Sequence, residues 1–353
     1  MKEKIICGIQ QIGIGVKDVT EAWKWYIEVL GFDIKIFDDK GVAEKMLPYT
    51  GGKPQERRAV LAYNMRGGGG FEIWQPVGRE LNYPKKELLL GDLGIFSCKI
   101  KCPDVTFAFE TLKKKNVEII TTPCLSPANK MHFFIKDPFE NIFEIEEDSY
   151  VFLNEKKANG GVNGAIIGVS DMEKSIAFYS KILDYDTVVF DNTAVFEDLK
   201  GLAGANHTLR RVMLKRSKPL YGPLCELMGT SCIELIQNMD VAGTKIYHDR
   251  FWGDPGFIHL CFDIRNMDKI QEEIQTLGLD FVCDGGKDFD MGDANGHFTY
   301  IEDPDGTLIE FVETFKMPIV KKLGIMLNLK NRDDKKFLPK YMLKALRFAR
   351  VKL

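Results

Sequence analysis

The 353-residue sequence has no apolar run near the roughly 18–20 residues that a membrane-spanning helix needs. It has no excess of one charge either, because 48 Lys and Arg face 51 Asp and Glu. We therefore expect neither a nucleic-acid nor a membrane partner. The apolar part of the N-terminus is too short for a signal peptide. With 45% hydrophobic and 28% charged residues, the chain is expected to be a globular, cytoplasmic protein of about two domains.

The eight cysteines form no Cys-x-x-Cys pair, which argues against a zinc site made of thiolates. A chain of this length does not depend on disulfides for its stability. Most of the cysteines stand among apolar neighbours, where a free thiol behaves as a small hydrophobic side chain. We therefore expect buried, reduced thiols.

One pattern is present four times: a strand, a helix, and further strands of which the last carries a single glutamate between apolar residues. The first copy has an alternating strand over Ile9–Val16 and a helix that begins with a capping box at Asp18 and Glu21. The other copies begin with Ile95–Ile100, Val162–Val169 and Phe257–Ile264. The glutamates are Glu72, Glu144, Glu234 and Glu310. The pattern predicts four βαβββ units.

The units also repeat as pairs, because Ser97 and His259 are 162 positions apart, as are Glu72 and Glu234. The polar stretch 154–161 is expected to link the two halves, which gives domains at 1–150 and 161–315. Residues 316–353 form a basic tail with twelve Lys and Arg. Its amphipathic segment 337–348 predicts a helix that covers the domain or a partner subunit, so a homodimer is among the expected assemblies.

Residues from about 6 to 315 resemble the vicinal oxygen chelate superfamily, which includes glyoxalases, epimerases, extradiol dioxygenases and bleomycin-resistance proteins. The resemblance rests on Val16 and Asp18 after the first strand and on the run Asp303–Glu310 in the fourth unit. It implies an α+β fold in which four βαβββ modules form two tandem glyoxalase-like domains, followed here by the basic helical tail. In this family paired units form a cup of sheet around a divalent metal, with ligands from the first and last strands.

Strand alternation decides which side chains face such a cup. The inward first-strand positions are Gln11, Ser97, Gly164 and His259, and the inward last-strand positions are the four glutamates. If the units pair within the halves, each cup has only three ordinary ligands. The resemblance implies pairing across the halves, of unit one with four and of unit two with three. One cup then holds Gln11, Glu72, His259 and Glu310, and the other holds Ser97, Glu144, Gly164 and Glu234.

Amide, imidazole and carboxylate ligands suit one borderline or hard divalent ion such as Zn, Ni, Co or Mn. Such an ion acts as a Lewis acid on a carbonyl. By the resemblance, Glu310 is the base that moves a proton from the adjacent carbon, and Glu72 can serve the opposite face. The residues expected to line the substrate cavity are Trp74, Asp263 and His297. The remaining histidines are expected on the surface or in loops; these are His132, His207 and His248.

The expected activity is that of a metal-dependent isomerase or epimerase acting on a small molecule. Asp263 suggests a small polar substrate, keto-sugar or cyclitol-like. A glyoxalase-type lyase is an alternative, although the resemblance places Gly15 where that enzyme has its glutathione-binding arginine. An extradiol-type dioxygenase is disfavoured because Gly164 stands where that family has a histidine. A non-catalytic small-molecule binding protein is the last alternative, and such members usually lack the metal ligands.

Overall fold

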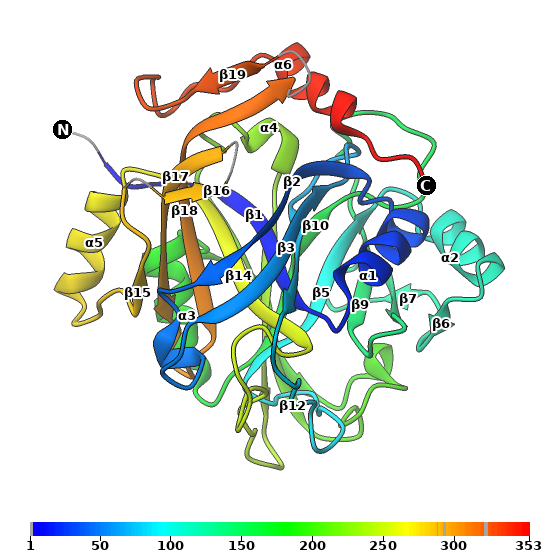
Figure 1. The fold of residues 1–353 in the computed structure, drawn as a ribbon. Coiled ribbons are helices and arrows are strands. Elements are labelled where there is room, and N and C mark those ends of the chain that lie inside the picture. The colour runs from blue at the N-terminus through cyan, green and yellow to red at the C-terminus, as the bar shows by residue number, and fades with distance from the viewer. Residues whose placement is uncertain (1–2, 288, 292–293, 321–323) are drawn as a thin grey trace.

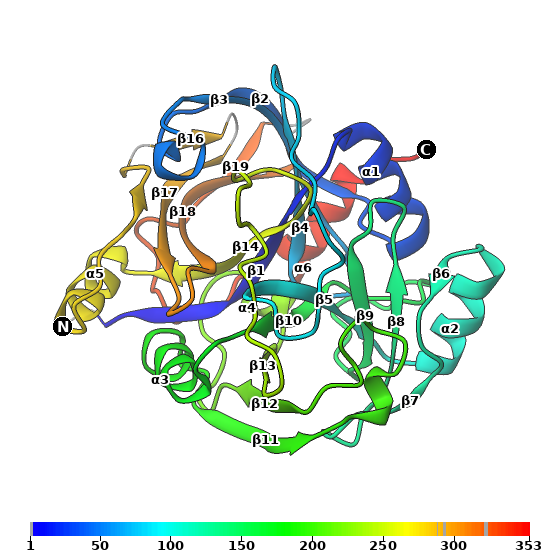
Figure 2. The ribbon, with the colours of Figure 1, turned by 90° about the horizontal axis from the view of Figure 1, so that it is seen from below.

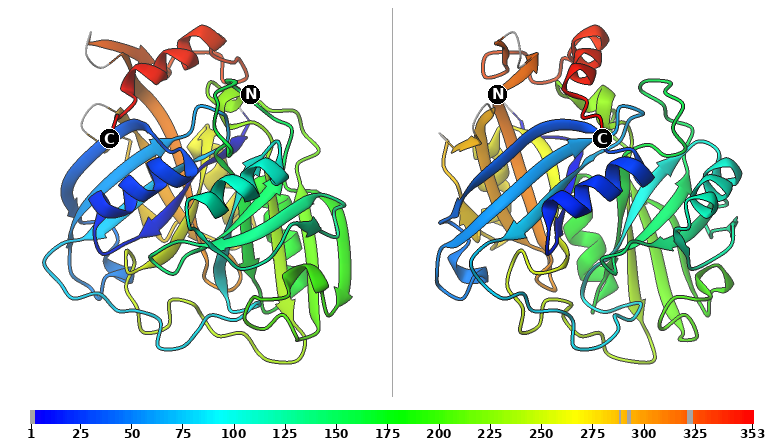
Figure 3. Two further views of the ribbon diagram at one scale, coloured as in Figure 1. Left: turned by 90° about the vertical axis from the view of Figure 1, so that its right-hand side faces the viewer. Right: turned by 45° about the vertical axis from the view of Figure 1, so that its right-hand side comes forward.

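The computed structural model describes residues 3–287, 289–291, 294–320 and 324–353 and shows two curled β-sheets lying side by side (Figure 1, Figure 2). One sheet contains strands from both ends of the chain, drawn in blue and orange, and the other contains the green strands from its middle (Figure 3). No described helix is long and apolar enough to cross a membrane.

The first sheet is built from the first and fourth units. Its strands are β1 (Ile5–Gly15), β2 (Ile34–Ala43), β3 (Gln55–Tyr63), β4 (Gly70–Pro76), β14 (Gly256–Arg265), β15 (Cys283–Asp284), β16 (Phe289–Met291), β17 (Ala294–Glu302), β18 (Leu308–Val320) and β19 (Ile325–Asn328). The main order is β15-β17-β18-β14-β1-β4-β3-β2, with β16 beside β17 and β19 beside β18. The antiparallel pair β1–β14 joins the two units at the centre, from Ile5 opposite Arg265 to Gly15 opposite Gly256.

The second sheet is built in the same way from the second and third units. Its strands are β5 (Gly94–Cys102), β6 (Glu118–Ile119), β7 (Cys124–Leu125), β8 (Met131–Lys136), β9 (Ile142–Glu147), β10 (Val162–Gly168), β11 (Thr187–Ala194), β12 (Leu209–Lys215) and β13 (Cys232–Asn238). The main order is β11-β12-β13-β10-β5-β9-β8-β6, with β7 beside β8. The four predicted units and their pairing across the halves are confirmed, and each sheet takes strands from both halves of the chain.

One helix follows the first strand of each unit. These helices are α1 (Val19–Trp25), α2 (Val105–Lys114), α3 (Met172–Leu183) and α5 (Met267–Thr276). The predicted cap of α1 is present, because Asp18 accepts hydrogen bonds from the backbone N–H groups of Thr20 and Glu21. The apolar side of β1, with Ile12 and Ile14, packs in the same buried core as α1. The opposite side of the strand is therefore left to face the inside of the curl.

Two segments that are not elements of the repeated βαβββ pattern close one end of the first sheet. They are the short helix α4 (Cys225–Met228) and the tail, whose helix α6 (Lys340–Ala345) continues as a 3₁₀ turn over Leu346–Ala349. The tail lies across the end of the blue and orange sheet (Figure 1, Figure 3). Leu343 and Leu346 are buried with Leu61 and Leu227, so the tail helix covers its own chain. All eight cysteines are free, and seven are buried.

Candidate metal centre

Four neighbouring strands at the centre of the first sheet each carry one predicted ligand. In the order β18, β14, β1 and β4, these ligands are Glu310, His259, Gln11 and Glu72. Gly13 pairs with Glu72, and Cys261 pairs with Glu310. Each of these two residues follows the first-strand ligand of its unit by two positions, so all four ligand side chains project from the same face of the sheet.

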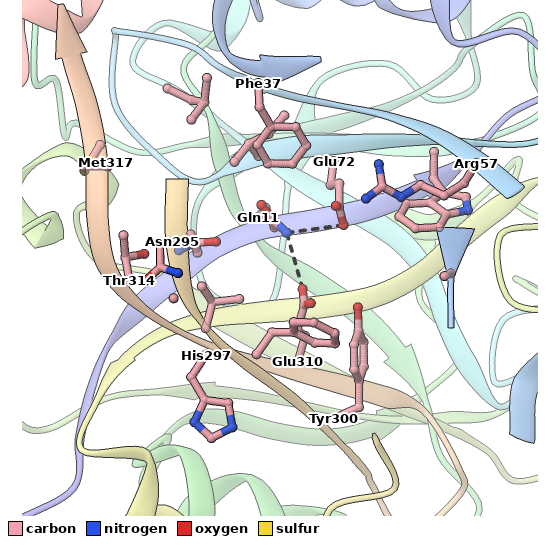
Figure 4. A pocket seen from close by; sticks show the side chains of 18 of the residues that line it. Gln11, Phe37, Arg57, Glu72, Asn295, His297, Tyr300, Glu310, Thr314 and Met317 are labelled. Carbon is pink, nitrogen blue, oxygen red and sulfur yellow. Dashed lines mark hydrogen bonds between the residues drawn. The ribbon is translucent and has the colours of Figure 1, made fainter. Parts of the chain in front are cut away.

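The polar ends of these four side chains meet at one buried point. Nε2 of His259 lies 3.3 Å from Oε2 of Glu72 and 3.2 Å from Oε2 of Glu310. Nε2 of Gln11 donates long hydrogen bonds of 3.4 Å and 3.3 Å to the same two oxygens (Figure 4). One ligand atom each from Glu72, His259 and Glu310 lies within 4.8 Å of the other two. The sheet therefore brings together all four residues that the sequence singled out.

Three atoms of this group are buried without hydrogen-bond partners, Oε1 of Gln11 and both ring nitrogens of His259. Buried polar atoms nearly always have partners, so such atoms need an explanation. A divalent ion at the shared point would bind Nε2 directly, and it would bind Oε1 after the Gln11 amide turns over. The mixed nitrogen and oxygen donors fit an ion such as Zn, Ni, Co or Mn.

The charges at this point perturb one another. Burial works against the charged form of His259, but Glu310 and Glu72 outweigh it and raise the pKa of the imidazole. Burial raises the pKa of Glu310, and the negative charge of Glu72 adds to this rise, while His259 opposes it. Two carboxylates this close repel each other unless a positive charge lies between them. The site is therefore suited to hold a cation.

Two residues that the sequence reasoning did not select shape the site. A Cβ on Gly13 would lie 2.4 Å from Cε1 of His259, so glycine is needed there for the imidazole to reach the centre. Tyr300 pairs across the strands with Glu310, and its ring lies edge-on to His259 with centroids 5.5 Å apart. Strand alternation places Gly13 on the same inward face as Gln11, and this could have identified Gly13 from the sequence. No motif in the sequence around Tyr300 indicates that it lies at the site.

The group opens into a cavity of about 300 Å³ inside the curled sheet. Trp74 and His297 are among the residues that line this cavity. Asp263 is not among its lining residues, so that prediction is wrong. Its carboxyl is buried against the Cys7 thiol. Cys7 packs with Leu224 and Cys225 at the end of the sheet that α4 covers. The small polar substrate that Asp263 suggested thus loses its support.

The second sheet carries the other predicted set on β13, β10, β5 and β9, but cationic side chains fill its centre. Nζ of Lys99 binds Glu144 and lies 2.8 Å from Oε2 of Glu234. Arg211 binds Glu234 and Asp198. Burial alone would lower the pKa of Lys99, but the surrounding glutamates raise it well above its ordinary value, so the ammonium stays charged. Protein cations hold the place that a metal would take.

The second centre also corrects one expectation about histidines. His132 was expected on the surface or in a loop, but it is fully buried on β8, and its Nδ1 lies 2.7 Å from Glu144. Ser97 is buried, and a Cβ on Gly164 would lie 1.9 Å from the carbonyl oxygen of Cys232. No side chain can therefore be accommodated at Gly164 without a shift of the backbone.

Comparison with known proteins adds the family context. The family model described as Glyoxalase/Bleomycin resistance protein/Dioxygenase superfamily matches residues 8–145 and 161–311. The lactoylglutathione lyase of Pseudomonas aeruginosa PAO1 is 26% identical over 157 residues, 43% of this chain and 81% of that protein. Glyoxalase I from Zea mays has a similar fold, with a TM-score of 0.55 and 17% identity over 88% of this chain and 92% of that one. A putative dioxygenase from Bacillus subtilis subsp. subtilis str. 168 also has a similar fold, with a TM-score of 0.56 and 15% identity over 89% of this chain and 86% of that one.

Proposed function

Because the chain belongs to the Glyoxalase/Bleomycin resistance protein/Dioxygenase superfamily, we propose that it is a metal-dependent enzyme that moves a proton on the carbon next to a carbonyl. The proposal depends on one observation, the convergence of Gln11, Glu72, His259 and Glu310 at a single buried point. A divalent ion held by these side chains would supply Lewis-acid polarisation of the carbonyl oxygen.

Glu310 is the proposed base. Burial raises the pKa of its carboxyl, which brings it closer to the range in which a carboxylate both takes and returns a proton near neutral pH. Glu72 comes from the other unit and faces Glu310 across the Gln11 amide (Figure 4). A substrate carbon held between them would meet one carboxylate on each face, and this arrangement supports epimerisation as well as isomerisation.

A glyoxalase-type lyase is the second candidate, and the lactoylglutathione lyase relative supports it. One feature of this chain opposes it. A Cβ on Gly15 would lie 2.0 Å from the carbonyl oxygen of Asp254, so Gly15 leaves no room for a glutathione-binding arginine. Formation of lactoylglutathione from methylglyoxal and glutathione tests this candidate directly. An extradiol-type dioxygenase has less support, since Gly164 leaves no room for a histidine.

We propose that the enzyme is cytoplasmic and acts on a small-molecule substrate. The tail helix packs on its own chain, but Tyr341 and Phe348 on the tail are well exposed. A homodimer formed through this outer face is the proposed oligomer. Sedimentation of the purified chain tests it.

Solvent exchange tests the proposed chemistry. The chain, loaded with Zn, Ni, Co or Mn, is incubated in D₂O with 2-hydroxyacetophenone, and loss of the proton next to the carbonyl is followed by NMR. Glu310→Gln removes the base but keeps an oxygen, so exchange should fall by about 10²–10⁴-fold. The matched control is Glu313→Gln on the same strand, since Glu313 caps α5 instead of facing the cavity. A Glu310→Gln protein that keeps its metal and exchanges at the wild-type rate would remove Glu310 from the mechanism.

A further inference from the structure

The cavity above the candidate metal centre has the metal ligands at its base and a mixed wall, in which polar residues such as Arg57, Asn295 and His297 stand beside many apolar ones. Its upper wall is formed by apolar side chains from β2, β3, α4, β18 and the tail. These are Ile36, Phe37, Val42, Leu61, Leu224, Leu227, Val312, Met317 and Leu346. In Figure 4, Phe37 and Met317 lie on one side of the group of Gln11, Glu72 and Glu310, and Tyr300 lies on the other. Ligand sites of this kind hold an apolar body by its walls and fix its orientation with a few polar groups.

Two of the charged wall residues, Arg57 and His297, have acidic partners. Nη1 of Arg57 lies 2.6 Å from Oδ2 of Asp39, and the guanidinium lies over the ring of Trp74. Nε2 of His297 lies 2.6 Å from Oδ1 of Asp284. The other charged residues of the wall, Glu44 and Lys45, are exposed. A substrate with several hydroxyls or carboxylates would lose hydration along these walls, and buried polar groups without partners are costly.

Part of this apolar wall, which we call the roof, comes from the α4 segment between β12 and β13 and from the tail. Leu224 and Leu227 flank or belong to α4, and Leu346 belongs to the tail. The roof segments are tied together, because the backbone N–H of Leu338 donates to the carbonyl of Pro223. The end of the tail is also held, since the N–H of Val351 donates to the carbonyl of Asp33. The roof is thus a fixed wall above the site.

We propose that the substrate is a neutral carbonyl compound that carries a bulky apolar group, and that Phe37, Met317 and Leu346 hold this group above the metal centre. This inference rests on the proposed function, because the carbonyl end is placed by the metal ligands. It replaces the small polar substrate expected from the sequence. Selectivity for the apolar group would come from β2 and the tail, and chemistry would come from the four central strands.

Two metal-chelating probes of different size test the inference. Acetohydroxamate and 2-naphthohydroxamate share one pair of chelating oxygens, so any difference in binding reports on the apolar group. Their affinities for the metal-loaded chain are measured by calorimetry. The naphthyl compound should bind at least about tenfold more tightly, because burial of apolar area is favourable. Equal or weaker binding of the naphthyl compound would overturn the inference.

Substitutions in the cavity wall test which side chains hold the apolar group of the ligand. Leu346→Ala should reduce the preference for the naphthyl compound several-fold. Leu343→Ala is the matched control, because Leu343 is buried in the same tail cluster without lining the cavity, and it should keep the preference. Phe37→Ala provides a second lining variant from β2. A preference unchanged in both Leu346→Ala and Phe37→Ala would contradict the assignment.

Metal-stripped protein separates this inference from the proposed function. If the metal centre is as proposed, removal of the ion should abolish binding of acetohydroxamate. Acetohydroxamate that binds the stripped and loaded chains equally would reject the metal centre. The ratio between the two probes would still test the apolar cavity, so the two failures are distinguishable.

Discussion

Gly13 on β1 stands directly opposite His259 on β14, and a Cβ on Gly13 would lie 2.4 Å from the imidazole. Gly13→Ala should therefore displace His259 and weaken metal binding by about 10–100-fold, as expected when the orientation of a ligand is disturbed. Gly41→Ala on β2 is the control, because the nearest atoms to its Cβ lie 3.6 Å away. Competition with a fluorescent chelator measures the affinity. Equal affinities for the two variants would contradict the positioning role of Gly13.

The buried Lys99 should stabilise the fold without contributing to metal binding. Lys99→Met leaves Glu144 and Glu234 without the ammonium that they share, and breaking such a buried pair costs about 3–5 kcal/mol. Urea denaturation measures the free energy of unfolding. Lys174→Met removes an exposed ion pair with Asp171 and should cost less than about 1 kcal/mol. A Lys99→Met protein as stable as Lys174→Met would show that the ammonium is not needed.

Glu72→Gln distinguishes one-base from two-base chemistry. If Glu72 and Glu310 act on opposite faces of the substrate carbon, Glu72→Gln should block net inversion of a chiral substrate. Glu310 should still exchange the proton of one epimer with solvent. Deuterium incorporation by NMR and optical rotation, followed together, measure both outcomes. Full inversion by the Glu72→Gln protein would assign both proton transfers to Glu310.

Asp263 should make stability depend on pH. Burial raises the pKa of its carboxyl from 3.8 to about 7, so the folded chain holds this proton more firmly than the unfolded chain. This contribution to stability is fully present below about pH 3.8 and is lost as the pH rises through about 7. Asp263→Asn should therefore gain in Tm relative to wild type between pH 5 and pH 8. A difference in Tm that is the same at both pH values would contradict the raised pKa.

The repeat made much of the fold predictable. Each unit places its first-strand residue and its glutamate in the same register, so Gln11, Glu72, His259 and Glu310 were found by position without knowledge of tertiary contacts. Local rules also gave the cap at Asp18. These features depend on neighbours in sequence or on the periodicity of strands, and both can be read from residues.

Features that depend on packing between distant segments were missed. Alternation correctly turned Asp263 inward, but it carried no information about α4 and the tail, which cover that end of the sheet. His132, Lys99 and Arg211 come from three different strands, and only the folded sheet shows that they meet at Glu144 and Glu234. The apolar roof was also hidden, because its side chains come from α4 and the tail, neither of which is an element of the repeated βαβββ pattern.

We propose that one metal ion per chain is held by ligands from both halves, and the metal content of the purified chain tests this proposal. Wild type, His259→Ala and His132→Ala are loaded with excess Zn, Ni, Co or Mn, dialysed, and measured by mass spectrometry of the elements. His132 is the matched control because it is a buried strand histidine beside a glutamate of the second centre. We expect about one ion per chain in wild type and His132→Ala, and almost none in His259→Ala. Two ions per wild-type chain, or a full complement of metal in His259→Ala, would contradict it.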